Sequence, residues 1–268
     1  MSTLADRTIA ALRTSQDDLA ARVANFTDAD LDLPSGAAEW DVAQVLSHLG
    51  SAAQIGLAGL SNGLAGASAP DQDFNIAVWD RWNALSQRGK ADGFLTASEE
   101  LVAAYEALDG EQRRDLKVQL GFLPFPADVT LLSGMRLNEF VLHSWDVRVA
   151  FDPAARLPRG EAAVLLEQFQ GPMSFLVGFT GKVDVLDGEH VHVLVHTTDQ
   201  EQEFGLALQD SVSLGEAHEQ PHVVLSAETE TVIRLLAGRL SEQHTPDSLT
   251  ITGDAATIEQ LRQVFPGY

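Results

Sequence analysis

The chain has 268 residues, 45% of them hydrophobic, and its 39 acidic against 17 basic side chains give a formal net charge of -22. So acidic a surface repels nucleic acid and anionic lipid, and we expect neither as a partner. The absence of cysteine excludes disulfides, a thiolate nucleophile and cysteine-ligated metal, so any sulfur chemistry must use the sulfur of a small molecule.

Helical periodicity dominates the first half of the chain. A stretch rich in Ala, Leu and Arg predicts a helix over residues 4–23. Asp41 and Gln44 have the spacing of a capping box, which starts a second helix that runs to about residue 60. Three more helices are expected over residues 74–87, 96–108 and 128–150. Helices joined in this way favour an up-and-down bundle, with Trp79, Trp82 and Trp145 in its core.

The pattern changes after residue 152, where a helical domain (residues 1–152) is expected to give way to an α+β domain (residues 153–268). A helix is predicted over residues 160–177, and Asp187-Gly188 predicts a hairpin turn. Strands are expected over residues 182–186, 190–197, 203–208, 222–226 and 248–252, and further helices over residues 228–240 and 255–265. The expected fold class is therefore mixed, a two-domain α+β protein with an all-α domain first.

Three ionisable side chains interrupt the apolar stripe of the helix predicted over residues 128–150. Glu139 and His143 are four residues apart and Asp146 follows one turn later, so all three share the face expected to pack inward. His48 lies on the inward stripe of the second predicted helix. Because burying a carboxylate is costly unless it is paired or bound to a cation, these residues suggest a shared cation.

His48, Glu139 and His143 together form a set of two histidines and one carboxylate, which suits Zn²⁺ and also Fe²⁺, Ni²⁺ or Mn²⁺. Three protein ligands leave one coordination position open, as in catalytic zinc sites. Asp146 is expected to accept the N–H of a ligating histidine, and Arg136 to hold the Glu139 carboxylate or a substrate anion. A Glu and a His four residues apart are also a common surface pair, so spacing alone leaves both interpretations open.

Two segments around these residues, 40–49 and 136–146, resemble the signature helices of the mycothiol-dependent maleylpyruvate isomerase family. That family belongs to the wider group of DinB-like metal-binding bundles. Residues 235–240 and 251–254 are similar to the sterol-carrier-like domain attached to many members. The resemblance implies a DinB-like up-and-down four-helix bundle followed by a sterol-carrier-like α+β domain.

The resemblance also implies a divalent metal, usually zinc, held by His48, Glu139 and His143, with water or the thiolate of mycothiol in the open position. A metal-bound thiol is deprotonated and is therefore a nucleophile at neutral pH. In the family's isomerase, the thiolate adds to a cis double bond, the bond rotates and the thiol leaves. The implied function is a mycothiol-dependent isomerase or thiol transferase that acts on a small, carboxylate-bearing electrophile.

An anionic substrate needs a local cation in so acidic a protein. Arg239 matches the Gly-Arg of the family's C-terminal domain, which implies that it binds the substrate carboxylate over the metal and, with Asp146, takes part in catalysis. Arg239, Arg234 and Arg136 are the candidates for binding the thiol cofactor. Arg234 and Arg239 could equally be solvated charges at the end of a helix.

Two other function classes stay open: a non-catalytic metal-containing module that binds a small ligand or a protein, and a metal-assisted hydrolase. The loops at residues 61–70 and 120–126 are expected near the metal. The chain lacks a basic leader with an apolar segment and any long apolar run, so we expect a cytoplasmic monomer or homodimer without membrane contact.

Overall fold

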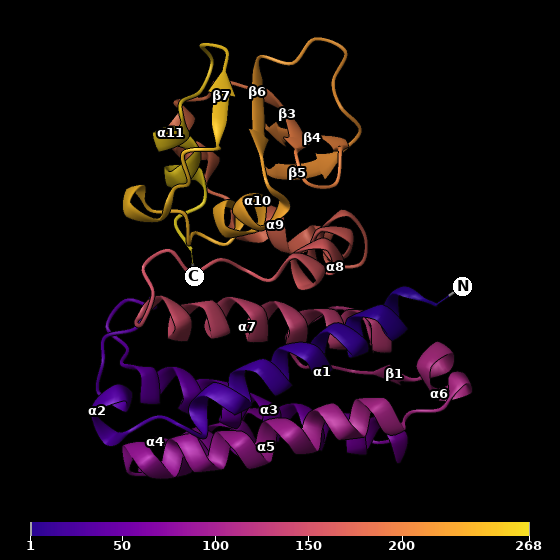
Figure 1. Cartoon of the computed structure of the whole chain (residues 1–268). Helices are drawn as coiled ribbons and strands as arrows, with labels where there is room; N and C mark the ends of the chain where they lie inside the picture. Colours follow the sequence, from indigo (N-terminus) through magenta and orange to yellow (C-terminus); the bar gives the residue numbers. More distant parts are fainter. Residues whose placement is uncertain (1, 268) are drawn as a thin grey trace. The chain divides into compact units, whose positions relative to one another are not determined.

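The computed structural model describes residues 2–267 and divides the chain into two units (Figure 1). The first unit ends at Ala155 and the second begins at Arg156, shortly after the predicted domain boundary at residue 152. The first unit is helical apart from two very short strands, whereas the second combines a sheet with helices. The mixed α and β fold class predicted from the sequence is therefore confirmed.

Four long helices of the first unit pack along one another: α1, α3, α5 and α7. The elements of this unit are α1 (Leu4–Val23), α2 (Asp28–Leu31), α3 (Val42–Leu64), α4 (Gln72–Asn83), α5 (Gln87–Ala107), α6 (Gly110–Asp115), β1 (Lys117–Val118), β2 (Ala127–Asp128) and α7 (Val129–Val149). The strands β1 and β2 pair with each other in antiparallel fashion and close a loop beside the bundle. The helices predicted over residues 4–23 and 128–150 are confirmed.

The long helices do not simply alternate in direction along the chain. Lys90 near the start of α5 donates to Gln44 near the start of α3, and Leu101 lies beside Gly56 further along both helices. α3 and α5 therefore run the same way, because the loop after α3 and helix α4 return the chain to the end where α5 begins (Figure 1). The expected up-and-down order therefore applies only when α4 is counted as the helix that runs back between α3 and α5.

Side-chain caps set where the helices begin. The side chain of Asp41 accepts from the backbone N–H of Gln44, and Asp128 caps α7 through Leu131 in the same way. The capping box predicted for α3 is only half formed, because the Gln44 amide contacts Asn83 instead of returning to Asp41. The cap positions nevertheless orient the two helices that carry the candidate ligands.

Two predictions for the bundle are wrong. The helix predicted over residues 96–108 is α5, which already begins at Gln87; Gly89 and Gly93 weaken the helical pattern of its first turns. Gly93 packs closely against Trp82, since a Cβ there would lie 3.1 Å from the Trp82 ring. Trp79, assigned to the core, has 41% of its surface exposed, whereas Trp82 and Trp145 are buried as predicted.

The second unit contains one five-stranded sheet in the order β5-β4-β3-β6-β7. Its elements are α8 (Arg159–Gln170), α9 (Ser174–Thr180), η1 (Val183–Leu186), β3 (Val191–Thr197), β4 (Gln202–Leu208), β5 (Val212–Gly215), β6 (Val223–Ala227), α10 (Thr229–Leu236), η2 (Glu242–His244), β7 (Thr250–Thr252) and α11 (Ile258–Val264). Strands β3 and β6 are parallel and the other neighbours are antiparallel. Along β3 the valines are buried and the intervening residues are not, which is the alternation expected of a half-buried strand.

The structure corrects several elements of this unit. Residues 183–186 form a short 3-10 helix, η1, and not the predicted strand, so Asp187-Gly188 turns the chain into β3 without making a hairpin. The helix expected over residues 160–177 is split into α8 and α9 at Gly171-Pro172, because proline lacks the N–H that would continue the helix. The strand β5 was not predicted.

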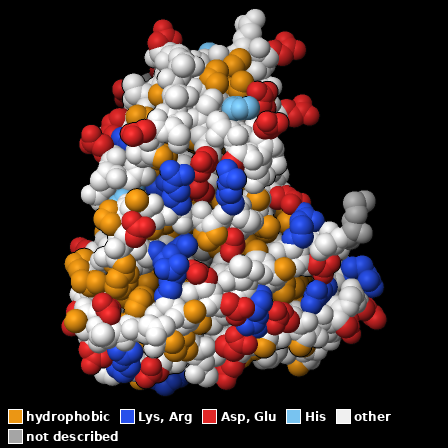
Figure 2. Space-filling view, viewed as in Figure 1, with side chains coloured by type: hydrophobic (Ala, Val, Ile, Leu, Met, Phe, Trp, Pro, Cys, Tyr) orange, Lys and Arg blue, Asp and Glu red, His pale blue; other side chains and the backbone are white. Residues whose placement is uncertain are grey.

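Acidic side chains are spread over the face seen in Figure 2, with Lys and Arg scattered between them and no continuous basic patch on that face. Among the described residues, no helix is both long and apolar enough to cross a membrane.

Candidate metal centre

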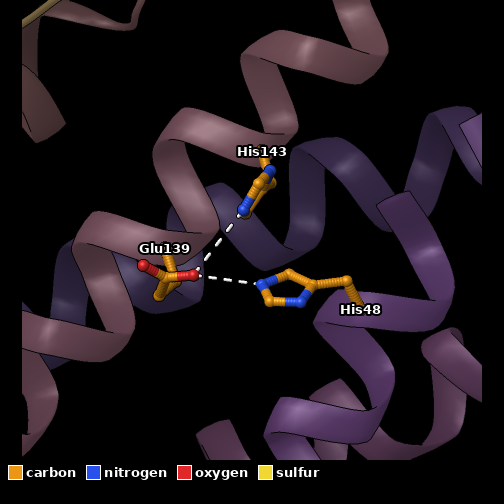
Figure 3. A group of neighbouring side chains, drawn as sticks. All are labelled: His48, Glu139 and His143. Atoms are coloured by element: carbon orange, nitrogen blue, oxygen red, sulfur yellow. Dashed lines mark hydrogen bonds and ion pairs between the residues drawn. The ribbon is translucent and has the colours of Figure 1, made fainter. Parts of the chain in front are cut away.

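Three potential ligand atoms converge between two helices of the first unit. His48 comes from α3, and Glu139 and His143 lie one turn apart on α7 (Figure 3). Glu139 Oε2 lies 3.1 Å from His48 Nε2 and 3.6 Å from His143 Nε2. One ligand atom from each residue falls within 4.8 Å of the other two. The structure thus brings together the three residues that the sequence analysis selected as metal ligands.

Asp146 orients one of these imidazoles. Its carboxylate oxygen lies 2.8 Å from Nδ1 of His143, and the Asp146 side chain is fully buried, with an exposed fraction of 0%. Because an ionised carboxylate can only accept, Nδ1 of His143 carries the proton. With the proton on Nδ1, the neutral ring keeps its lone pair on Nε2 for a metal ion, whereas the protonated ring donates from Nε2 to Glu139 instead.

The ionisable side chains at the centre shift one another's pKa values. Burial opposes ionisation of Glu139, but hydrogen bonds from His143 and His48 outweigh it, so the pKa of this carboxyl lies below its ordinary value. Burial lowers the pKa of His143, whereas the carboxylates of Asp146 and Glu139 raise it, and the net direction is upward. Glu139 therefore stays ionised and attracts either protons on the imidazoles or a cation in their place.

Two of the three donor separations match those around a small divalent cation, and the third, between the two histidines, lies within 4.8 Å. Zinc bonds to histidine nitrogen and carboxylate oxygen are about 2.0–2.2 Å long, so two ligand atoms of a tetrahedral ion lie about 3.3–3.5 Å apart. The observed separations from Glu139 Oε2 of 3.1 Å to His48 and 3.6 Å to His143 bracket that value. Two imidazoles with one carboxylate also match the chemistry of Zn²⁺, Ni²⁺, Fe²⁺ and Mn²⁺ sites.

Trp40 is a site residue that was not singled out from the sequence. Its ring centroid lies 5.2 Å from that of His48 and 5.9 Å from that of His143, with the latter pair stacked. The indole therefore forms a wall against both imidazoles and limits their rotation. The sequence signal for it is position: Trp40 directly precedes Asp41, the cap of the helix that carries His48.

A cavity of about 420 Å³ adjoins the centre, with His48 and Glu139 in its wall. The two loops expected near the metal both contribute to it, through Ala69, Pro70, Leu120, Gly121 and Phe122. Trp79 lines the same cavity, which explains why this tryptophan is not part of the core. The remaining lining comes from α3, α4, α5, β1 and α7 and is mostly apolar.

The three candidate arginines have different surroundings. Arg136 lies in the cavity wall beside Glu139. Arg234, in the second unit, is buried and donates 2.8 Å from Nε to Glu230 and 2.7 Å from Nη1 to the His244 carbonyl, so its guanidinium is committed to its own unit. Arg239 donates through Nη1 to the Ala237 carbonyl at 3.1 Å. The expected contacts of Arg234 and Arg239 with thiol or substrate stay predictions.

Comparison with known proteins adds a family to this geometry. The model described as the mycothiol maleylpyruvate isomerase N-terminal domain matches residues 12–148, a range that contains all three candidate ligands and Asp146. A search of the curated proteins found no match.

Among solved structures, a crystal structure of the mycothiol-dependent maleylpyruvate isomerase superposes with a TM-score of 0.63 at 13% identity, covering 94% of this chain and 96% of that one. A histidine-to-alanine mutant of the isomerase gives a TM-score of 0.64 at the same 13% identity and with the same coverage, 94% and 96%. At this level of identity the comparison shows a shared fold that extends over both units.

Proposed function

Since the chain belongs to the mycothiol maleylpyruvate isomerase N-terminal domain family, we propose that it is an enzyme that uses a divalent metal and mycothiol to isomerise, or to add a thiol to, a small electrophile. The observation that carries this proposal is the convergence of His48, Glu139 and His143 beside a cavity large enough for a small molecule. A purely structural cluster would gain nothing from adjoining such a space.

We assign the metal to the two imidazole nitrogens and the Glu139 carboxylate, with zinc as the first choice and nickel, iron or manganese as alternatives. When bound, such a cation lowers the pKa of a thiol or water in its free coordination position, and so supplies a nucleophile at neutral pH. Asp146 keeps the proton on Nδ1 of His143, and Trp40 holds both rings in place. These residues would prepare the site before any ligand arrives.

The absence of cysteine supports a thiol that is supplied by a small molecule and not by the protein. The mostly apolar wall of the cavity supports chemistry from which water is excluded, and this favours isomerisation or thiol transfer over hydrolysis. Arg239 is proposed to bind a substrate carboxylate. It follows Gly238, whose φ of 68° is a left-handed conformation that favours glycine and sets the direction of the chain at this arginine.

The proposal is tested by elemental analysis of the purified protein, followed by thermal unfolding with and without mycothiol. We expect bound divalent metal, and a Tm that mycothiol raises only in the metal-loaded protein, because selective binding to the native state must stabilise it. His48→Ala should lose the metal, whereas His190→Ala, which removes an exposed histidine of the second unit, should retain it.

Three results would count against the proposal. Native protein without stoichiometric metal, or full metal content in His48→Ala, would contradict the assignment of His48, Glu139 and His143 as a metal centre. Metal without any response to mycothiol would leave the hydrolase or the non-catalytic binding module as the better description.

A further inference from the structure

The cavity beside the candidate centre has a distinctive lining. Apart from His48 and Glu139 at the centre itself, the only ionic side chain among the described lining residues is Arg136. Much of the remaining wall is aliphatic or aromatic, with Ile55, Leu60, Trp79, Phe122 and Leu132 as its larger members. A ligand that fills this space must therefore present mostly apolar surface.

Arg136 is a buried cation with unsatisfied donors. Its exposed fraction is 7%, and Nη2 donates to the Ser98 hydroxyl at 3.1 Å. Cζ lies 5.3 Å from the ring centroid of Phe140. Nε and Nη1 are buried and have no hydrogen-bond partner among the described residues. Buried guanidinium groups are normally paired, and because Arg136 also lines the cavity, it is a candidate partner for an anion bound there.

Among the described residues of the first unit, no carboxylate forms an ion pair with Arg136 that would neutralise it fully. Burial lowers its pKa to about 10, and Tyr105 and Glu139 act in the opposite direction, so the side chain remains charged at neutral pH. Glu139 directs one oxygen to the imidazoles of His48 and His143, and it would share its charge with a bound cation. An anion in the cavity would supply the missing counter-charge.

A second polar group marks the cavity wall. Asn75 of α4 lines the same space, and its Oδ1 is buried and has no hydrogen-bond partner in the part of the chain that the structure describes. Its amide could bond a hydroxyl, keto or amino substituent on a ligand, because either end of an amide group can face such a partner.

We propose that the cavity binds an amphiphilic monoanion: an aliphatic or aromatic body packs against the apolar wall, and one carboxylate pairs with Arg136. That this molecule is the electrophilic substrate rests on the proposed function, whereas its binding does not. The described cavity wall offers no second arginine or lysine, so a second carboxylate would have no counter-charge there. The ligand class of the cavity is therefore a monocarboxylate with an apolar body, and a second carboxylate inside the cavity is disfavoured.

The probe for this proposal is 4-phenylbutyrate, compared with the uncharged amide of the same shape and with the dicarboxylate phenylsuccinate. Binding is measured by calorimetry and by tryptophan fluorescence, to which Trp79 in the cavity wall contributes, in metal-loaded and in chelator-treated protein. We expect phenylbutyrate to bind about tenfold or more tightly than the amide, because a charge-assisted pair replaces a neutral contact, and more tightly than phenylsuccinate.

Arg136→Met should abolish the preference for the acid over the amide, whereas Arg81→Met, which removes an exposed cation of α4 outside the cavity, should preserve it. Ala52→Phe, which places a ring into the cavity one turn beyond His48, should weaken both probes. Arg136→Lys retains the charge and should keep part of the preference; it replaces Arg136→Met if the latter does not fold.

Equal affinity for acid and amide in the native protein would overturn the proposal, as would a preference that survives Arg136→Met or binding unaffected by Ala52→Phe. Acid binding that disappears with the metal would place the carboxylate on the cation and not on Arg136. Competition between mycothiol and phenylbutyrate would indicate that the cavity is the binding site of the thiol and not of a monoanionic substrate. Failure of metal or mycothiol binding alone would contradict the proposed function and leave this ligand site standing.

Discussion

Two helices each carry a carboxylate and a guanidinium about one turn apart. On α10 these are Glu230 and Arg234, and on α7 they are Glu139 and Arg136. On α10 the guanidinium donates twice to Glu230, at 2.8 Å and 2.9 Å, and Glu230 also accepts from Thr231 and from the backbone of Leu157. On α7 two donors of the Arg136 guanidinium have no partner among the residues that the structure describes, and 31% of the Glu139 side chain is exposed.

The difference separates a structural ion pair from a binding site. A buried pair is tolerable when every donor and acceptor is satisfied, as in the α10 pair, but such a pair has nothing left to offer a ligand. Arg136 and Glu139 on α7 instead line a cavity, and a ligand in that cavity can supply the hydrogen bonds and counter-charge that Arg136 lacks. Substitutions in the two regions should therefore have opposite consequences, for stability on α10 and for binding on α7.

Breaking the α10 pair should have the largest effect. Arg234→Met leaves Glu230 buried without its partner and should lower the free energy of unfolding by about 3–5 kcal/mol. Glu259→Gln, which breaks the exposed pair between Arg262 and Glu259, should cost only about 0.2–1 kcal/mol. Urea unfolding followed by circular dichroism measures both. Comparable losses for the two variants would show that the α10 pair is not structural.

On α7, the corresponding change should affect the metal more than the fold. Asp146→Asn removes the carboxylate that accepts from Nδ1 of His143, so metal affinity should fall by roughly 10–100-fold. Competition with a chromophoric chelator measures the dissociation constant. Asp247→Asn in the second unit, which changes a carboxylate outside the centre, is the control and should leave the affinity unchanged. An unaltered constant in Asp146→Asn would mean that Asp146 does not orient the ligand.

Two glycines of α3 extend the comparison to packing. A Cβ on Gly50 would lie 2.1 Å from the Trp82 ring, whereas a Cβ on Gly59, in the cavity wall, would meet nothing closer than 3.9 Å. Gly50→Ala should therefore destabilise the protein by about 1–3 kcal/mol through overpacking. Gly59→Ala should stabilise it by up to about 1 kcal/mol, because alanine is the better helix former. Thermal unfolding with opposite shifts in Tm would support this, and shifts of the same sign would contradict it.

The α10 pair should also give a smaller, pH-dependent effect. Burial raises the pKa of Glu230, but Arg234, Thr231 and the Leu157 N–H lower it, and the net value lies below the ordinary 4.5. Because the pKa of Glu230 is lower in the folded than in the unfolded protein, its ionised form stabilises the fold at any pH above the unfolded-state pKa. This stabilisation is lost as the pH falls from 4.5 to below the pKa of the folded state.

Glu230→Gln, which cannot titrate, should therefore be less stable than the native protein at neutral pH and lose less stability on acidification. Unfolding midpoints measured over a pH series test this. Parallel curves for the two proteins would exclude Glu230 as a source of the acid sensitivity.

The sequence by itself determined the features that depend on neighbours along the chain. The four-residue spacing of Glu139 and His143 places both on one face of α7, and the caps Asp41 and Asp128 set where the two ligand-bearing helices begin. The alternation of valines along β3 likewise indicated its buried face. Hydrogen bonds and side-chain direction within one element follow from a few consecutive residues, so a single sequence is enough to read them.

Only the tertiary structure decided what depends on elements that are distant in the sequence. The position of His48 opposite Glu139, the parallel course of α3 and α5, and the exposure of Trp79 to the cavity all follow from how helices pack across the bundle. Residues 183–186 are apolar enough for a strand, but strand formation requires a partner, and here the chain forms a 3-10 helix. The unpaired donors of Arg136 have the same origin, since whether a buried charge is satisfied depends on every element around it.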